Sequence, residues 1–439
     1  MSISPQRRQE IIDALRRGTV PRNSLDAFAV GLGRFEEVLH EELQRVGTGS
    51  GLFKAVRGEY GCGKTFFARW LADTARKLGF ATSEIQVSET ETPLHRLETV
   101  YRRLTERLAT ADTPQGALRN IIDGWFFTLE EDVLAEGTID PNDAAALLER
   151  TGELLEQRLA KVSSAAPTFS AALRGYRQAQ AEDNQTVADG ILAWLSGQPN
   201  VAAAAKRYAG VKGDIDHFGA MNFLQGILAV LRDSGQPGML VVLDEVETIQ
   251  RVRSDVRDKS LNALRQLIDE VDSGRFPGLY LLITGTPAFF DGPQGISRLE
   301  PLAQRLHADF VTDARFDNPR AVQIRLPAFD LNRLCLVGCR VRDIYQQHTA
   351  AGARIAQHCS DEYVRQLAEA VTGKLGGKVG IAPRIFLKKL VGDVLDRVDQ
   401  FEEFDPRRDY SLTISETELT PVERQASGAA SVDDIELDL

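Results

Sequence analysis

The chain has 439 residues, close to three times a usual domain length of about 150, so two or three structural units are expected. Its composition is 43% hydrophobic and 26% charged, which is ordinary for a soluble globular protein. No run of about 18 apolar residues is present, which excludes a membrane-spanning helix. The start MSISPQRRQE has no apolar segment after its basic residues, so we expect no secretory signal and a cytoplasmic location. The formal net charge of −11 argues against a basic nucleic-acid coat.

The first part of the chain alternates between helical and strand patterns. Residues 1–33 are predicted to form an amphipathic helix over 6–17 and a linker. A second helix is expected over 34–46, followed by a short buried strand over 52–57. The run GEYGCGKT follows that strand directly and leads into a helix that ends at Gly79. The run FATSEIQVS then alternates like a second strand.

A long helical stretch separates the early strands from the later ones. Residues 94–234 show no convincing strand, and we predict a helical insertion at about 101–235 within a nucleotide-binding core of 34–330. Two buried apolar runs, GMLVVLDEVETI and GLYLLITGTP, then flank a helix over 254–271. Strands separated by helices in this order predict an α/β fold, a parallel sheet with helices on both faces.

The C-terminal part is predicted to be a helical lid and a tail. The pattern is helical after the last strand, so residues 331–400 are expected to form the lid. Residues 401–439 are predicted to be an acidic tail, disordered for most of its length. Residues 411–439 hold seven acidic residues and one arginine, a charge of −6, and too little apolar surface to offset the entropy of ordering. The alternative is that the run IELDL docks on a partner.

The run GEYGCGKT fits the phosphate-loop pattern G-x-x-x-x-G-K-[ST] without deviation. Its glycines let successive N–H groups point inward and form an anion nest, and the following helix adds its positive end. Lys64 would reach the β- and γ-phosphates of ATP, and the Thr65 hydroxyl would ligate Mg²⁺. The residues expected to bind the nucleotide are Gly58, Glu59, Tyr60, Gly61, Cys62, Gly63, Lys64, Thr65 and Phe66.

Two carboxylates follow the apolar run LVVL at a predicted strand end. Ligands of parallel α/β sheets bind at the carboxyl ends of the strands, so Asp244 and Glu245 are expected near the phosphate loop. Asp244 would hold the Mg²⁺ together with Thr65. Glu245 would polarise the water that attacks the γ-phosphate.

Further polar residues are expected around the phosphates. A hydroxyl at the next strand end could hold the attacking water, with Thr286 the first candidate and Thr284 the second; the alternative is an ordinary turn. Arg298 and Arg305 lie seven residues apart, which predicts one helix face. Either arginine could act on the γ-phosphate of a neighbouring subunit, the alternative being two solvated side chains. Arg384 is expected at a helix start in the lid, from which it would reach back over the nucleotide.

These elements together resemble the AAA+ ATPases, in the branch of the origin-recognition and initiator-loader proteins. The resemblance covers roughly residues 20–400. It implies that Thr286 or Thr284 stands at the sensor 1 position and Arg384, in the run APR, at sensor 2. It also implies that the segment 31–34 packs near the adenine base.

Two longer runs resemble the ATP-binding proteins of bacterial BREX phage-defence systems. They are RRQEIIDALRRGTVPRNSLDAFAVGLGR and VRGEYGCGKTFFARWLADTARKLGF. The resemblance implies a cytoplasmic defence ATPase that works beside methyltransferase, phosphatase-like and helicase components. Lys64 and Asp244 lie 180 positions apart (244 minus 64), which departs from AAA+ spacing. The role of the insertion is therefore not carried over.

Three functions remain open on the sequence. The first is an ATP-hydrolysing switch or motor that forms a homo-oligomer, because a trans arginine needs a neighbour, and that acts on double-stranded DNA or on the defence complex. The second is an ATP-binding scaffold with little turnover. The third is a DNA-binding protein with a structural nucleotide. Its candidate basic residues are Arg174, Arg177, Lys206, Arg207 and Lys212 in the insertion and Lys374, Lys378, Lys388 and Lys389 in the lid.

Overall fold

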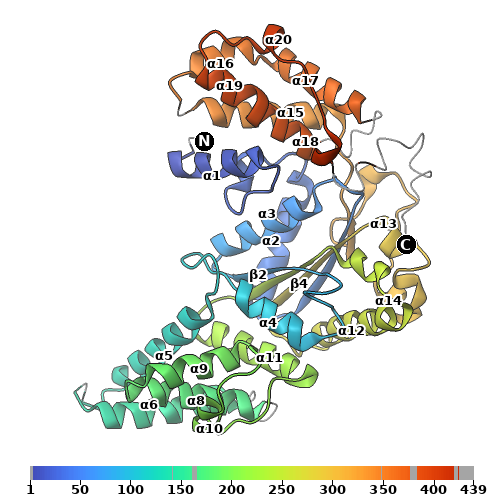
Figure 1. Ribbon diagram of the computed structural model, residues 1–439. Helices are drawn as coiled ribbons and strands as arrows, with labels where there is room; N and C mark the ends of the chain where they lie inside the picture. Colours follow the sequence, from blue (N-terminus) through green and yellow to red (C-terminus); the bar gives the residue numbers. More distant parts are fainter. Residues whose placement is uncertain are drawn as a thin grey trace.

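The protein is built from a helical bundle, a sheet-containing core and a helical lid, stacked in that order (Figure 1). The core lies in the middle, with the bundle at its lower end and the lid above it in this view. The computed structural model describes residues 3–140, 142–160, 166–347, 349–375, 383–419 and 424.

The core contains a five-stranded sheet with the strand order β2-β3-β4-β1-β5. Every pairing in it is parallel, which confirms the predicted α/β architecture and is consistent with a P-loop AAA+ fold. β5 was not predicted, because a strand of three residues is too short to give a recognisable apolar run. The strands are β1 (Leu52–Arg57), β2 (Ala81–Gln86), β3 (Met239–Asp244), β4 (Leu279–Gly285) and β5 (Gln323–Arg325).

Helices cover both faces of the sheet. α2 (Gly33–Gly47) and α3 (Lys64–Lys77) share a hydrophobic cluster with one face, whereas α4 (Leu97–Arg107) and α12 (Ser254–Asp272) share another cluster with the opposite face. The helices predicted over 34–46 and 254–271 are therefore confirmed within one residue.

The sheet separates two hydrophobic cores. Along β3, Leu240 and Val242 face the cluster that continues into the lid, while Val241 and Leu243 face the cluster that continues into the bundle. Alternate residues of a strand point to opposite faces, so a strand buried on both faces reads as one apolar run. Each such side chain contributes about 1.5–3 kcal/mol when fully buried, which makes the sheet the rigid base of the molecule.

The insertion between β2 and β3 is a bundle that leaves the sheet. Because α4 packs against β2 as part of the core layer, we place the start of the insertion at α5. The bundle consists of α5 (Leu118–Ala135), α6 (Ala144–Arg158), α8 (Pro167–Ala181), α9 (Gln185–Leu195), α10 (Ala203–Tyr208) and α11 (His217–Asp233).

The lid forms the opposite end of the molecule, and the N-terminal helix α1 (Pro5–Arg16) packs against it (Figure 1). Arg16 Nε lies 2.6 Å from Asp396 Oδ2, and the Tyr345 hydroxyl donates to Asp396 Oδ1 at 2.7 Å. The lid helices are α15 (Leu331–Gln346), α16 (Gly352–His358), α17 (Asp361–Lys374), α18 (Pro383–Lys388), the π-helical turn η6 (Lys389–Leu395) and α19 (Asp396–Gln400).

Part of the predicted disordered tail is ordered. The chain continues through α20 (Pro406–Asp409) and η7 (Glu416–Glu418), and its apolar side chains at positions 410, 412, 414 and 419 pack against the lid core. The prediction is therefore wrong for residues 401–419, because composition averaged over the whole tail hides this spaced apolar set. Residues 420–423 and 425–439, which include IELDL, lie outside the described residues.

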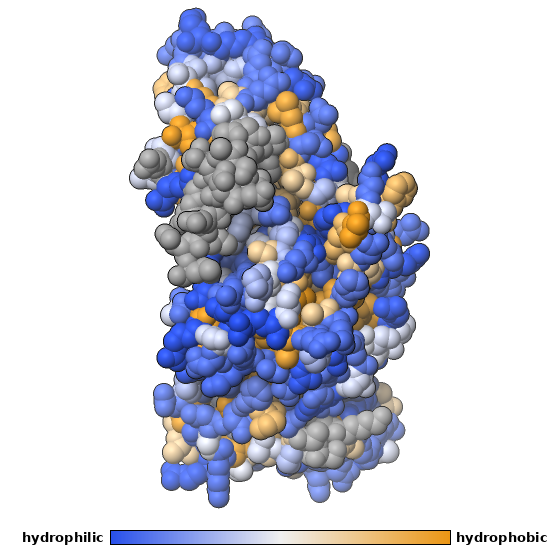
Figure 2. All heavy atoms as spheres, turned by 90° about the vertical axis from the view of Figure 1, so that its right-hand side faces the viewer, coloured by the Kyte–Doolittle hydropathy of each residue, from blue (hydrophilic) through white to orange (hydrophobic). Residues whose placement is uncertain are grey.

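Several short helices connect the strands. η2 (Val246–Arg251) follows β3, whereas α13 (Pro287–Asp291), η3 (Ile296–Arg298) and α14 (Glu300–Arg305) lie between β4 and β5. In the described part of the chain, no helix has both the length and the apolar character needed to cross a membrane. Figure 2 shows a face on which hydrophilic side chains predominate, with hydrophobic ones scattered among them.

Candidate nucleotide-binding site

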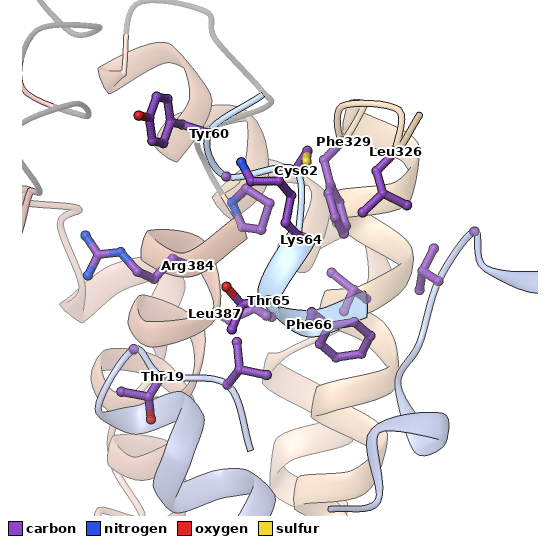
Figure 3. A pocket seen from close by; sticks show the side chains of 18 of the residues that line it. Thr19, Tyr60, Cys62, Lys64, Thr65, Phe66, Leu326, Phe329, Arg384 and Leu387 are labelled. Atoms are coloured by element: carbon purple, nitrogen blue, oxygen red, sulfur yellow. The ribbon is translucent and has the colours of Figure 1, made fainter. Parts of the chain in front are cut away.

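A cavity of about 460 Å³ lies where the phosphate loop, the end of β3, the N-terminal segment and the lid meet (Figure 3). Small-molecule sites usually fall between about 300 and 1,000 Å³. The sheet edge and the phosphate loop form what we call the floor of the cavity. The roof consists of residues 15–32, α15 and α18.

The phosphate loop curls around the start of α3. Gly63 adopts φ +94°, a left-handed conformation that suits glycine, and a Cβ on Gly58 would lie 2.4 Å from Cys62 Sγ. Lys64 Nζ donates to the carbonyls of Gly58 at 2.9 Å and Glu59 at 3.3 Å. The first residues of α3 line the cavity, and a helix N-terminus is an arrangement that binds anions.

The residues expected to hold Mg²⁺ meet at one corner of the floor. Thr65 Oγ1 donates to Asp244 Oδ2 at 2.8 Å, and the Thr284 hydroxyl donates to Asp244 Oδ1. Asp244 is buried at the end of β3. Carboxylate and hydroxyl oxygens are hard ligands of the kind that Mg²⁺ takes together with phosphates and water, so this donor set fits the ion.

Glu245 lines the cavity directly after β3. Its backbone has φ +60° and ψ +44°, a strained conformation for a non-glycine residue that is common at functional sites. Its N–H donates to the Thr284 hydroxyl at 3.1 Å, and Gln86 Nε2 donates to its carboxylate at 2.7 Å. The neighbouring strands thus hold both ends of Glu245. Gln86 was not predicted, because only the pairing of Gln86 with Asp244 in the β2–β3 register brings it there.

A third carboxylate, that of Glu247, also lines the cavity and was missed on the sequence. The residue is 4% exposed, and Oε1 lies 3.8 Å from Lys64 Nζ. Its Oε2 has no hydrogen-bond partner among the described residues. Burial raises the pKa of Glu247 to about 7, although Lys64 opposes the shift. The spacing of acids in the run DEVE is the signal that could have identified it.

The two threonine candidates differ in position. Thr284, the second candidate, is fully buried in β4 and contacts both Asp244 and Glu245. Thr286, the first candidate, stands before α13 and does not line the cavity. The structure therefore brings Thr284 to the site, because the register of β3 and β4 places the C-terminal ends of the two strands side by side.

The roof supplies apolar and basic groups. The rings of Phe28 and Phe66 meet edge to face, with centroids 5.2 Å apart, beside the cavity. Gly31, in the segment that the resemblance places near the base, lines the cavity as well, whereas Arg34 turns away and donates to the carbonyls of Ala314 and Arg325.

Arg384 lines the cavity from the start of α18, the predicted helix start. One of its terminal nitrogens donates to the Glu418 carbonyl at 2.7 Å. Figure 3 shows its side chain directed away from Lys64. Arg251 and Arg333 also line the cavity and were not predicted.

Arg298 and Arg305 do not share one helix, which corrects that prediction. Arg298 ends η3, and Arg305 ends α14, a new helix with Pro301 in its first turn. Arg298 Nε lies 3.2 Å from Asp258, and Arg305 pairs with Asp269 further along α12. Neither side chain lines the cavity of its own chain.

The comparisons with known proteins identify the family of the chain. No curated protein and no solved structure matches the chain. One family model, described as BREX system ATP-binding protein BrxC/D, matches residues 3–414. This range contains the phosphate loop, the strand ends and the whole described lid. The chain therefore belongs to the BREX system ATP-binding protein BrxC/D family, whose members are ATP-binding proteins of BREX phage-defence systems.

Proposed function

We propose that the protein hydrolyses ATP with Mg²⁺ and works as an AAA+ switch or motor of its defence system. One observation carries the proposal: Lys64, Thr65, Asp244 and Glu245 converge on one floor of a cavity large enough for a nucleotide. Apolar groups of the roof suit a base, and the N-terminus of α3 suits phosphates.

The floor residues divide the chemistry among them. The loop N–H groups and Lys64 would bind the phosphates, which requires Lys64 to leave the carbonyls of Gly58 and Glu59. Mg²⁺, held by Thr65 and Asp244, would neutralise charge on the phosphates. Glu245, oriented by Gln86 and Thr284, would accept a hydrogen bond from the attacking water and orient it.

The second candidate function is an ATP-binding scaffold with little turnover of its own. The observation that favours it is that Arg298 and Arg305 both pair with acids of α12 rather than facing the cavity of their own chain. Hydrolysis that needs a trans arginine would wait for assembly of a homo-oligomer, so a lone chain would bind ATP and release little phosphate.

Turnover and ATP binding of variants separate the two functions. Glu245→Gln is expected to lower turnover at least about 100-fold and to retain ATP binding, whereas Lys64→Ala is expected to lose binding. Glu136→Gln, an exposed carboxylate of the bundle paired with Arg150, is the control for removal of one charge. Unchanged turnover in Glu245→Gln would sink the hydrolytic mechanism. Background turnover in the wild type, with ATP bound, would favour the scaffold.

Partners follow from the family at a coarse level, since membership of a BREX system implies other BREX components. We propose that these include the methyltransferase, phosphatase-like and helicase proteins, and that the protein acts in the cytoplasm.

Direct contact with double-stranded DNA remains a prediction. The bundle gives it little support, because residues 118–233 hold ten basic and sixteen acidic residues, a net charge of −6. Arg174, Arg177 and Lys206 each pair with an acid. The lid candidate Lys378 lies outside the described residues. Binding of duplex DNA measured across a salt titration tests the prediction, since phosphate contacts give a steep negative slope.

A further inference from the structure

The ordered part of the tail runs back over the lid to the rim of the nucleotide cavity. Residues 410–419, which we call the latch, pack their spaced apolar side chains against the lid core. The Tyr410 hydroxyl donates to Asp393 of η6 at 3.2 Å. These contacts bring the end of the latch, η7, beside the first turns of α18 and η6.

Glu418 joins the latch to three basic residues of the lid. Its carboxylate lies 2.9 Å from Lys389 Nζ and 3.4 Å from Lys388 Nζ, and its backbone carbonyl accepts from Arg384 at 2.7 Å. Although burial opposes the shift, Lys389, the Ser415 N–H and Lys388 lower the pKa of Glu418 to about 2. The carboxylate is therefore charged at neutral pH and holds the latch by charge-assisted contacts.

Arg384, which donates to the Glu418 carbonyl, also lines the nucleotide cavity. Arg384 reaches the rim between the latch and Gly18, where a Cβ would lie 3.6 Å from a guanidinium nitrogen. Its side chain is directed away from Lys64 (Figure 3). Lys389 begins a π-helical turn, a feature found frequently at functional sites.

We propose that the latch holds Arg384 in a retracted position, and that release of Glu418 from the lid lets Arg384 reach the phosphates of the bound nucleotide. The proposal rests on the ATPase function proposed above and names a regulator of that same site. Glu418 is a positioning residue in this scheme, because it acts through Arg384 and does not touch the nucleotide.

The chemistry of the contact makes it reversible. A guanidinium donates to a neutral backbone carbonyl less strongly than to a doubly charged phosphate, with which it can form paired hydrogen bonds. Arg384 therefore gains when it exchanges the carbonyl for a nucleotide. The latch, by contrast, keeps its apolar contacts and its lysine pairs, and these oppose the exchange until bound ATP displaces Glu418.

Steady-state ATP turnover of full-length variants tests the proposal. Glu418→Gln weakens the lysine pairs and is expected to raise kcat at least about threefold, with KM for ATP unchanged or lower. Arg384→Ala is expected to lower turnover, and the double variant to match Arg384→Ala alone, because the latch acts through that arginine. Glu402→Gln, an exposed acid beyond α19, is the matched control. If Glu418→Gln lowers turnover or leaves it unchanged, the latch does not restrain Arg384.

A second variant and a second measurement guard against a folding defect. Ile414→Ala removes an apolar anchor of the latch without changing a charge, and it is expected to raise kcat as Glu418→Gln does. Amide hydrogen exchange of residues 411–419 is expected to accelerate when a non-hydrolysable ATP analogue binds the wild type. Unchanged exchange would overturn the latch. This second readout does not need hydrolysis, so it tests the latch even if the wild type turns over no ATP and the proposed ATPase function fails.

Discussion

The floor and the roof of the cavity are built in different ways. The floor consists of strand ends and the phosphate loop, and its polar side chains contact one another within a rigid sheet edge. The roof is assembled from two segments, the N-terminal segment and the lid, and the latch packs against the lid. Ion pairs such as Arg16 with Asp396 and Glu418 with Lys389 join them. Changes in the floor should therefore alter chemistry, whereas changes in the roof should alter affinity and control.

The largest effect is expected at the metal corner of the floor. Asp244→Asn removes the charge that would hold Mg²⁺ and keeps the size of the side chain, but it replaces one of the two oxygens that accept from Thr65 and Thr284 by an NH2 donor. We expect turnover to fall by about 10²–10³-fold at saturating ATP, as for loss of an electrostatic group at a reacting centre. ATPase rates over a Mg²⁺ titration measure this effect, with Asp255→Asn in α12 as the control. An unchanged Mg²⁺ dependence of turnover would show that Asp244 does not hold the metal.

A second large effect is expected at Glu247, because burial makes its charged form unfavourable and lowers the stability of the protein at neutral pH. The pKa of Glu247 is raised by burial from 4.5 to about 7. The folded state therefore binds a proton more tightly than the unfolded chain between these values, and this contribution to stability falls as the pH rises from 4.5 to 7. Glu247→Gln is expected to stabilise the protein relative to wild type by an amount that grows with pH, up to about 3 kcal/mol.

Urea unfolding of both proteins at pH 5 and pH 8 measures this difference. Glu149→Gln, a carboxylate change in the bundle, is expected to give no pH-dependent difference. A constant difference between Glu247→Gln and wild type at both pH values would show that Glu247 is already ionised at pH 5.

Most of the floor could be predicted from the sequence, for a physical reason. An apolar run buried on both faces identifies β3 and β4, and the phosphate-loop pattern needs residue types that few other structures need. The side chains that depend on register could not be assigned. Gln86 and Thr284 contact Glu245 only because neighbouring strands align them, and local sequence carries no such information.

The roof was harder to predict because its contacts join distant segments. Arg16 and Asp396 are 380 positions apart, and the latch was hidden by the acidic composition of the tail. The prediction that Arg298 and Arg305 share one helix face was wrong for a local reason, since a new helix with Pro301 in its first turn begins between them. The helices of the roof, among them the helix start at Arg384 after Pro383, were predicted from local patterns, but the contacts between them were not.

A smaller effect distinguishes the two threonines at the edge of the floor. Thr284→Val keeps the shape of the buried side chain and removes its hydrogen bonds to Asp244 and from Glu245. We expect turnover to fall about 10-fold, as for loss of a partner that orients a metal ligand. Thr286→Val is the matched control, expected to leave turnover unchanged because Thr286 lies outside the cavity. The reverse result would restore Thr286 as the hydroxyl that acts on the nucleotide.

The smallest effect is expected where the N-terminal helix meets the lid. Arg16→Ala removes the pair with Asp396, but the arginine side chain is 39% exposed, so solvent screens the pair and its loss costs at most about 1 kcal/mol. Because Leu15 of this helix and Gly18, two residues beyond its end, line the cavity, we expect ATP affinity to fall about threefold, and 0.5 M salt to reproduce this fall in the wild type. Isothermal titration with an ATP analogue measures both, with exposed Arg17→Ala as the control. If Arg16→Ala instead matched Asp244→Asn in its effect on turnover, the roof would take part in the chemistry and the division between floor and roof would fail.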